Sequence, residues 1–137
     1  MKTENSKRST GCPVAFGLDC FGDRWTLLVI RDMMVHGKRT YSAFLASEEQ
    51  VATNILISRL KQLEADGIVN KERDPNNRRS YIYSLTQKGQ DLAPVLLEII
   101  RWGGKHDSRE GAKRKIVDQL EQDQEGLEQQ LRSPSPD

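Results

Sequence analysis

Lysine, arginine, asparagine and serine side chains gather in residues 53–79, and these residue types suit contact with the phosphates and base edges of a nucleic acid. Residues 52–88 hold seven Lys or Arg and four Asp or Glu, whereas residues 116–131 hold five carboxylates and no base. An anionic partner is therefore expected to bind the cationic part of the chain. The candidates form two groups, with Thr53, Asn54, Ser58, Arg59 and Lys61 in the first and Lys71, Arg73, Asn77, Arg78 and Arg79 in the second.

Residues suited to catalysis or metal binding are few. Cys12, Cys20, His36 and His106 are the only cysteines and histidines, and their spacing matches no metal-ligand motif. The chain contains neither a nucleophile-and-base motif nor a glycine-rich phosphate loop. We therefore expect no enzymatic activity, no metal and no cofactor.

Cys12 is the residue with the greatest potential for redox chemistry. It stands directly before Pro13, which suits the first position of a helix. At a helix N-terminus the dipole and the free N–H groups stabilise a thiolate and raise its reactivity, so Cys12 is a candidate redox sensor. The alternative is a small capping residue near a contact between subunits, where burial would make the thiol inert. Cys20 lies in an apolar stretch and is predicted to belong to the core.

Length and composition set the class of the protein. A chain of 137 residues forms one domain and buries roughly two thirds of its unfolded surface without a disulfide or a metal. Charged residues make up 30% of the chain and apolar residues 36%, which is typical of a helix-rich globular protein. No segment approaches the roughly 18 apolar residues of a membrane span, and the first eleven residues contain no apolar run, so a cytoplasmic protein is predicted.

Three helices are predicted in the first fifty residues. The first begins at Pro13 and is broken at Gly22. The second, residues 24–35, is too continuously apolar for a surface helix, and Gly37 follows its end, so it should be the buried central helix. The third is short and spans residues 41–46.

A fourth helix, residues 53–66, has the clearest pattern. Leu56, Leu60 and Leu63 recur at spacings of four and three, which fixes the face directed to the core. At about 100° per residue, Asn54, Ser58 and Lys61 project from the opposite face, and Arg59 lies on the flank about 60° from the leucines. Such residues are usually no more than a solvated face, and Arg59 on its flank is as well placed to pair with a carboxylate as to contact a partner.

A β-hairpin is predicted next. Residues 68–73 and 80–85 read as strands, and the turn formers of residues 74–79 connect them, with Arg78 and Arg79 at the tip. Asn76 and Asn77 tolerate the positive φ that a tight turn requires. The basic residues here, Lys71, Arg73, Arg78 and Arg79, favour phosphate contact, although charges also protect strand edges from pairing with other chains.

The C-terminal third is predicted to be helical. Thr86 is placed to cap a helix that Pro94 kinks and that Gly103 and Gly104 end. A final helix, residues 109–131, carries the acidic side chains. The expected organisation is a flexible tail (1–11), a DNA-binding domain (12–104), a helical extension (105–131) and a disordered tail (132–137).

The order of these elements, two helices joined by a short turn and then a hairpin, is that of a winged helix-turn-helix protein. The predicted fold class is mainly α with a small β-hairpin, α+β. The outer face of the fourth helix would enter the major groove of double-stranded DNA, and the hairpin would follow the neighbouring backbone. Arg78 and Arg79 would then contact phosphates or a narrow minor groove.

Three stretches resemble the HxlR-type transcriptional regulators, a branch of the MarR-like winged helix proteins. They are CPVAFGLDCFGDRWTLLVIRDM, TNILISRLKQLEADGIV and IYSLTQKG, together with RWG near residue 102. The resemblance covers residues 12–104 and implies a homodimeric DNA-binding repressor whose subunits meet through the first and late helices. In some relatives a cysteine matching Cys12 senses oxidants and forms a disulfide between subunits, which implies an oxidant or small-molecule effector here.

These observations lead to one principal expectation and one alternative. We expect a dimeric, sequence-specific transcriptional repressor that binds a near-palindromic operator, with possible redox control through Cys12. Because the proposed DNA-binding face is only modestly basic, the alternative is a winged helix that has lost DNA binding and serves as a protein-interaction module.

Overall fold

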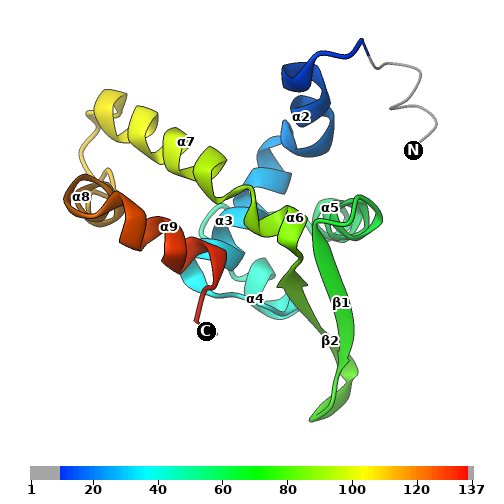
Figure 1. The fold of residues 1–137 in the computed structure, drawn as a ribbon. Coiled ribbons are helices and arrows are strands. Elements are labelled where there is room, and N and C mark those ends of the chain that lie inside the picture. Colours follow the sequence, from blue (N-terminus) through cyan, green and yellow to red (C-terminus); the bar gives the residue numbers. More distant parts are fainter. Residues whose placement is uncertain (1–9, 136–137) are drawn as a thin grey trace.

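The computed structural model describes residues 10–135, and it combines helices with a two-stranded antiparallel sheet, as predicted (Figure 1). Residues 1–9 of the predicted N-terminal tail and residues 136–137 of the predicted C-terminal tail lie outside the described residues, and Arg132 belongs to α9. The elements in chain order are α2 (Pro13–Phe21), α3 (Arg24–His36), α4 (Tyr41–Leu45), α5 (Thr53–Ala65), β1 (Val69–Asp74), β2 (Asn77–Leu85), α6 (Gln87–Gln90), α7 (Ala93–His106), α8 (Lys115–Gln122) and α9 (Gln124–Arg132).

The core is built around α3, which confirms its prediction as the central helix. Its buried residues pack with the leucine face of α5, with Phe44 of α4 and with one side of α7. The fully buried aliphatic and aromatic side chains therefore come from elements that precede the hairpin in the chain and from elements that follow it. They include Ile30, Met34, Phe44, Leu56, Leu63, Ile68, Val69, Leu97 and Leu131.

Local capping signals fix the ends of α3. The Asp23 carboxylate accepts a hydrogen bond from the Thr26 N–H at 3.1 Å, which satisfies one of the free donors of the first turn. Gly37 follows the last turn with φ 66°, a left-handed conformation that favours glycine. The helix includes His36, one residue more than predicted.

The hairpin differs from its prediction at the turn. Asp74 pairs with Asn77, so the connection is Pro75 and Asn76 alone. Arg78 and Arg79 therefore lie within β2 and not at the two-residue turn, in the part of the strand where the register shifts between the pairs Arg73–Tyr81 and Asp74–Asn77. The turn does not use the positive φ that Asn76 and Asn77 tolerate, since Gln50 is the only non-glycine residue among those described that has one.

The chain after the hairpin forms two helices where one kinked helix was predicted. Thr86 caps α6 as expected, its hydroxyl accepting from the Gly89 N–H at 3.1 Å. A Cβ at Gly89 would collide with the Ile68 carbonyl oxygen, so glycine allows α6 to lie directly against the start of the hairpin. Pro94 stands in the first turn of α7, where its missing N–H breaks no bond, and α7 then continues past Gly103 and Gly104.

The C-terminal extension is also two helices and not the single one predicted. Asp123 separates α8 from α9 and caps α9 by accepting from the Gly126 N–H at 3.0 Å. Leu120, Leu127 and Leu131 belong to the main core cluster. In Figure 1, α9 turns back beneath α7 towards α3 and α4. The extension therefore packs on its own subunit.

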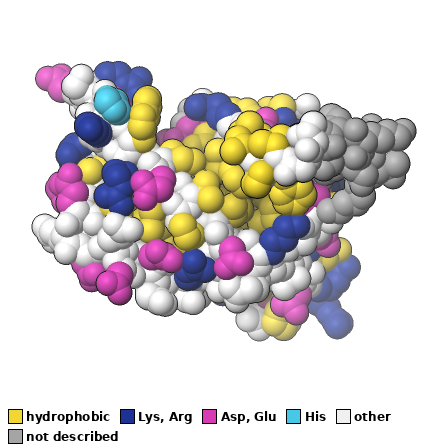
Figure 2. Space-filling view, turned by 45° about the horizontal axis from the view of Figure 1, so that its top comes forward, with side chains coloured by type: hydrophobic (Ala, Val, Ile, Leu, Met, Phe, Trp, Pro, Cys, Tyr) yellow, Lys and Arg dark blue, Asp and Glu magenta, His cyan; other side chains and the backbone are white. Residues whose placement is uncertain are grey.

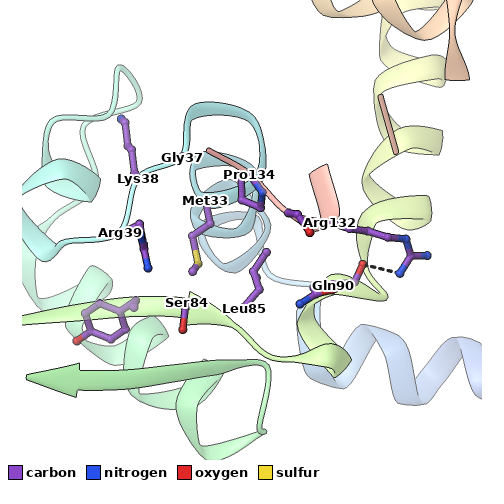
Figure 3. Close-up of a pocket in the computed structure, with 11 residues that line it drawn as sticks. Met33, Gly37, Lys38, Arg39, Ser84, Leu85, Gln90, Arg132 and Pro134 are labelled. Carbon is purple, nitrogen blue, oxygen red and sulfur yellow. Dashed lines mark hydrogen bonds between the residues drawn. The ribbon is translucent and has the colours of Figure 1, made fainter. Parts of the chain in front are cut away.

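A small cavity lies where the end of the extension meets the base of the hairpin (Figure 3). Met33 and Leu85 line it from α3 and β2, and Pro134 closes it from the C-terminal side. The Arg132 guanidinium donates to the Gln90 carbonyl at 3.3 Å and to Asp91 Oδ1 at 3.1 Å. Through these hydrogen bonds Arg132 links the end of α9 to the connection between α6 and α7.

Candidate nucleic-acid interface

The outward face of α5 carries the first group of predicted contact residues. Thr53, Asn54, Ser58 and Lys61 are all exposed, while the three leucines on the opposite face are buried to 3% exposure or less. Ile57 is 42% exposed on the same outward face and was not singled out by the sequence. The face is therefore polar with one apolar side chain, a combination that can meet base edges and thymine methyl groups.

Arg59 is paired on the flank of α5. Its Nε donates to Asp23 Oδ2 at 2.7 Å and its Nη2 to Asp23 Oδ1 at 3.2 Å. This pairing holds the pKa of Asp23 below its usual value, chiefly through the hydrogen bond from Arg59. The carboxylate partner that the sequence left open is thus Asp23, the capping residue of α3.

A groove separates α5 from the hairpin. α4 contributes the hydroxyl groups of Thr40 and Ser42 to its wall, which were not predicted as site residues. A capping threonine at the start of α4, followed two residues later by Ser42, is the sequence signal that could have identified them. The remaining lining residues are Tyr41, Ile57, Leu60, Lys61, Glu64, Lys71, Arg79, Ser80, Tyr81 and Tyr83.

Tyr81 organises the cations in the half of the hairpin nearer its turn. The Lys71 ammonium lies 4.2 Å from the centre of its ring, and the Arg73 guanidinium lies 4.9 Å from it. Arg73 also donates to the Tyr81 hydroxyl at 3.0 Å and to the Arg78 carbonyl. Arg73 therefore stabilises the hairpin itself, whereas Lys71 faces the groove.

The last three predicted residues lie at the outer end of β2. The Asn77 side chain donates to Ser80 Oγ at 3.1 Å and accepts from the Arg79 N–H at 3.2 Å, which stiffens this end of the strand. Arg79 lines the groove and Arg78 does not, and both lie where the register between β1 and β2 shifts. Both are exposed, and neither pairs with a carboxylate among the described residues.

A half-buried ion cluster supports the loop that precedes α5. The Arg31 guanidinium donates to both oxygens of Glu49, at 2.9 and 2.8 Å, and to Asp32 Oδ1 at 2.7 Å. Ser47 Oγ donates to Glu49 Oε1 at 2.7 Å. The hydrogen bond from Arg31 holds the pKa of Glu49 well below its usual range. The cluster fixes the loop against α3, and the only trace of it in the sequence is the Arg-Asp pair inside an apolar helix.

An apolar surface lies away from the groove, on α2 and α7. Figure 2 shows hydrophobic side chains gathered in a band on one face of the molecule. The exposed large side chains of the two helices are Val14 (69%), Phe16 (57%), Leu18 (60%), Ile99 (46%) and Trp102 (69%). Cys12 is exposed at the start of α2, and Cys20 is half-buried against the core, as predicted.

Neither a metal site nor a membrane helix is found in the described part of the chain. Residues 10–135 contain no group of three His, Cys, Asp or Glu side chains that could hold a metal ion. The helices formed by these residues are too short or too polar to cross a membrane.

Residues 20–111 match the HxlR-like helix-turn-helix family, and the chain belongs to this family. The predicted family and the winged helix α+β fold are thereby confirmed. The chain is 36% identical over 93 residues to the HTH-type transcriptional regulator YybR of Bacillus subtilis, covering 68% of this chain and 74% of YybR. Members of the family regulate transcription through a DNA-binding helix-turn-helix, which is the class of this protein.

Solved structures give the same class. The protein PA1607 superposes with a TM-score of 0.69 at 32% identity, covering 79% of this chain and 73% of PA1607. The redox regulator HypR in its oxidised form superposes with a TM-score of 0.61 at 33% identity, covering 72% of this chain and 99% of HypR.

Proposed function

We propose that the protein is a dimeric repressor that binds a near-palindromic operator through α5 and the hairpin. The observation that carries the proposal is the groove between α5 and β2, in which Lys61, Lys71 and Arg79 meet the hydroxyl groups of α4. A helix fits the major groove, and cations beside it neutralise the phosphates that flank the groove. Occupying the operator would exclude other proteins from it.

Each predicted residue has a proposed place in this complex. Asn54 and Ser58 face the bases, Thr53 and Lys61 the backbone, and Arg59 lies on the flank where it supports α5. Along the hairpin, Lys71 and Arg79 approach the phosphates beside the groove, and Arg78 lies outside the groove lining, where it approaches neighbouring phosphates. Arg73 and Asn77 act mainly by holding the hairpin in shape.

The dimer is proposed to form through the apolar surface of α2 and α7. Exposed apolar patches of this kind mark interaction sites, and a two-fold pairing would cover the patches of both subunits at once. It would also place two copies of α5 on successive major grooves about 34 Å apart. In this arrangement residues 12–104 form the DNA-binding unit, and residues 105–131 complete the core of the same subunit.

Binding to duplex DNA is the direct test. Fluorescence anisotropy with random duplex DNA, from low to moderate salt, should show an affinity whose logarithm falls linearly with the logarithm of the salt concentration. A duplex selected from a randomised library by the purified chain should bind more tightly by a factor of about 10³ or more. Absence of salt-sensitive binding to any duplex would favour a protein-interaction module in place of a regulator that contacts DNA.

Redox control through Cys12 is a second part of the proposal. The observation in its favour is that Cys12 is exposed beside the apolar surface of α2. Two Cys12 thiols from two subunits would lose two protons and two electrons to hydrogen peroxide, which is reduced to two water molecules as one disulfide bond forms. Intact-mass analysis should then find a covalent dimer in the wild type and in Cys20→Ser but not in Cys12→Ser. An unmodified Cys12 with unchanged DNA binding would remove this part of the proposal.

A further inference from the structure

Three side chains connect the start of α3 to the outward face of α5. Asp23 accepts from Arg59 Nε at 2.7 Å and from Nη2 at 3.2 Å, and Arg59 Nη1 donates to Ser58 Oγ at 3.1 Å. We name this set the Asp23–Arg59–Ser58 relay. All three guanidinium nitrogens of Arg59 are engaged within it, so the relay accounts for the orientation of the whole side chain.

The relay is anchored at its Asp23 end. Asp23 Oδ2 also accepts from the backbone N–H of Thr26, so the carboxylate is held by the first turn of α3. The paired side chains are only partly exposed, at 28% for Arg59 and 41% for Asp23. A guanidinium bound by both oxygens of a fixed carboxylate has little freedom to swing towards a phosphate. Arg59 is therefore suited to positioning another residue.

That other residue is Ser58. A serine hydroxyl has one proton to donate and two lone pairs that accept, and Arg59 occupies one of the lone pairs. Within residues 10–135 the Ser58 proton has no acceptor, and the side chain is exposed in the second turn of α5. The positive charge of Arg59 disfavours the approach of a second hydrogen-bond donor to the Ser58 hydroxyl and favours the approach of an acceptor. The hydroxyl is thus prepared to donate a hydrogen bond outwards.

We propose that Ser58 determines sequence specificity by donating to an acceptor on a base edge, with Arg59 and Asp23 as its positioning residues. In the major groove the acceptors are N7 and O6 of guanine, N7 of adenine and O4 of thymine, whereas cytosine presents a donor. The early turns of a recognition helix are the part that contacts base edges. The inference rests on the proposed function, because it requires that α5 enters the groove.

The decisive variants separate specificity from general affinity. Ser58→Ala removes one hydrogen bond, so it should weaken binding to the selected duplex about 2- to 10-fold and leave binding to random duplex unchanged. Asp23→Asn retains a good capping side chain for α3 but removes the charge that holds Arg59. It should lose selected-duplex affinity in the same direction, and the double variant should be no weaker than Ser58→Ala alone, because both changes act on one contact.

A repeated selection supplies a second readout. Binding-site selection with Ser58→Ala should lose base preference at one position in each half-site and keep it at the others. Arg59→Lys should give the same pattern, since lysine keeps the charge but cannot bind the carboxylate and the hydroxyl together. Lys61→Ala is the control, and it should weaken all duplexes alike. Thermal melting of each variant checks that the fold is retained.

Specific results would overturn the inference. If Asp23→Asn raised affinity for every duplex and steepened the salt dependence, Arg59 would be a phosphate contact that Asp23 restrains. If Ser58→Ala weakened random and selected duplexes equally, Ser58 would contact the backbone. If the wild type bound DNA and Ser58→Ala matched it, the relay alone would be wrong. If the wild type bound no duplex, the proposed function would fall and the relay with it.

Discussion

The surface of α5 and the hairpin differs from the surface of α2 and α7 in how its side chains are held. On the first, Arg59, Arg73 and Asn77 are each fixed by hydrogen bonds to neighbours. On the second, Phe16 and Trp102 project from their helices with more than half of their surface exposed. The first surface is ordered by contacts within the chain, whereas the second leaves large apolar side chains exposed.

The difference reflects what each surface is proposed to bind. Discriminating bases requires donors and acceptors at fixed positions, and ordering them in advance lowers the entropy lost on binding. Apolar association gains free energy in proportion to the area covered and needs little directional control. Substitutions on the two surfaces should therefore have different signatures.

The largest effect is expected for Trp102→Asp on α7. A charge buried without a partner in a subunit contact costs several kcal/mol, so the dimer should dissociate at least 100-fold more readily. Light scattering after gel filtration should find the 15.6 kDa chain in place of a particle of twice that mass. Gln129→Asp on the exposed face of α9 is the control and should leave the mass unchanged. A dimer that survived Trp102→Asp would show that α7 is not its contact.

Asn54→Ala should have the next largest effect, on the other surface. Loss of a side chain that contacts a base should cost about 1–3 kcal/mol on the selected duplex and almost nothing on random DNA. Competition binding with both duplexes measures the two values together. Equal losses on both would assign Asn54 to the backbone.

Arg79→Ala should weaken binding to all sequences by about 1 kcal/mol, because it removes a proposed phosphate contact. The slope of log affinity against log salt should fall by about 0.9. Arg78→Ala is the matched comparison, since Arg79 lines the groove and Arg78 does not. A smaller change for Arg78 would indicate that the phosphates follow the groove side of the hairpin, and the reverse order would place them on its far side.

The smallest effect is expected for Glu49→Gln in the Arg31 cluster. The folded pKa of Glu49 is depressed, so its ion pair stabilises the fold above the ordinary value of 4.5 and loses that contribution as the pH falls below it. Partial exposure limits the loss to about 1 kcal/mol at neutral pH. Urea unfolding at several pH values should show the difference from wild type shrinking in acid, while Glu110→Gln shows none. A difference independent of pH would assign the effect to packing.

The sequence predicted those features that depend on neighbours along the chain. The leucine spacing of residues 56–63 and the caps at Thr86 and Gly37 gave correct helices, because these interactions are local. The Asp23–Arg59 pair spans 36 residues and the Arg31–Glu49 pair spans 18, so only the folded chain brings them together. Local patterns therefore identified which face of α5 points outwards, but they did not identify Asp23, which holds Arg59 on the flank of that helix.

The incorrect predictions concern the residues at which helices and strands begin and end. Pro94 suggested a kink because its position relative to the helix start was unknown, and the same residue is harmless in a first turn. Asp123 weakened an apolar pattern in the sequence because it separates two helices. Strand β2 continues through polar residues because cross-strand pairing, and not composition, decides where a hairpin turns.

The course of the C-terminal extension determines where the chain emerges. Leu131 is completely buried and Arg132 fastens α9 beside α6, so Ser135 emerges near the small cavity at the base of the hairpin and not at the outer end of α7. A fluorophore attached at Ser135 would therefore lie close to the base of the hairpin. Its emission would report the approach of DNA in real time from a position outside the proposed contact surface.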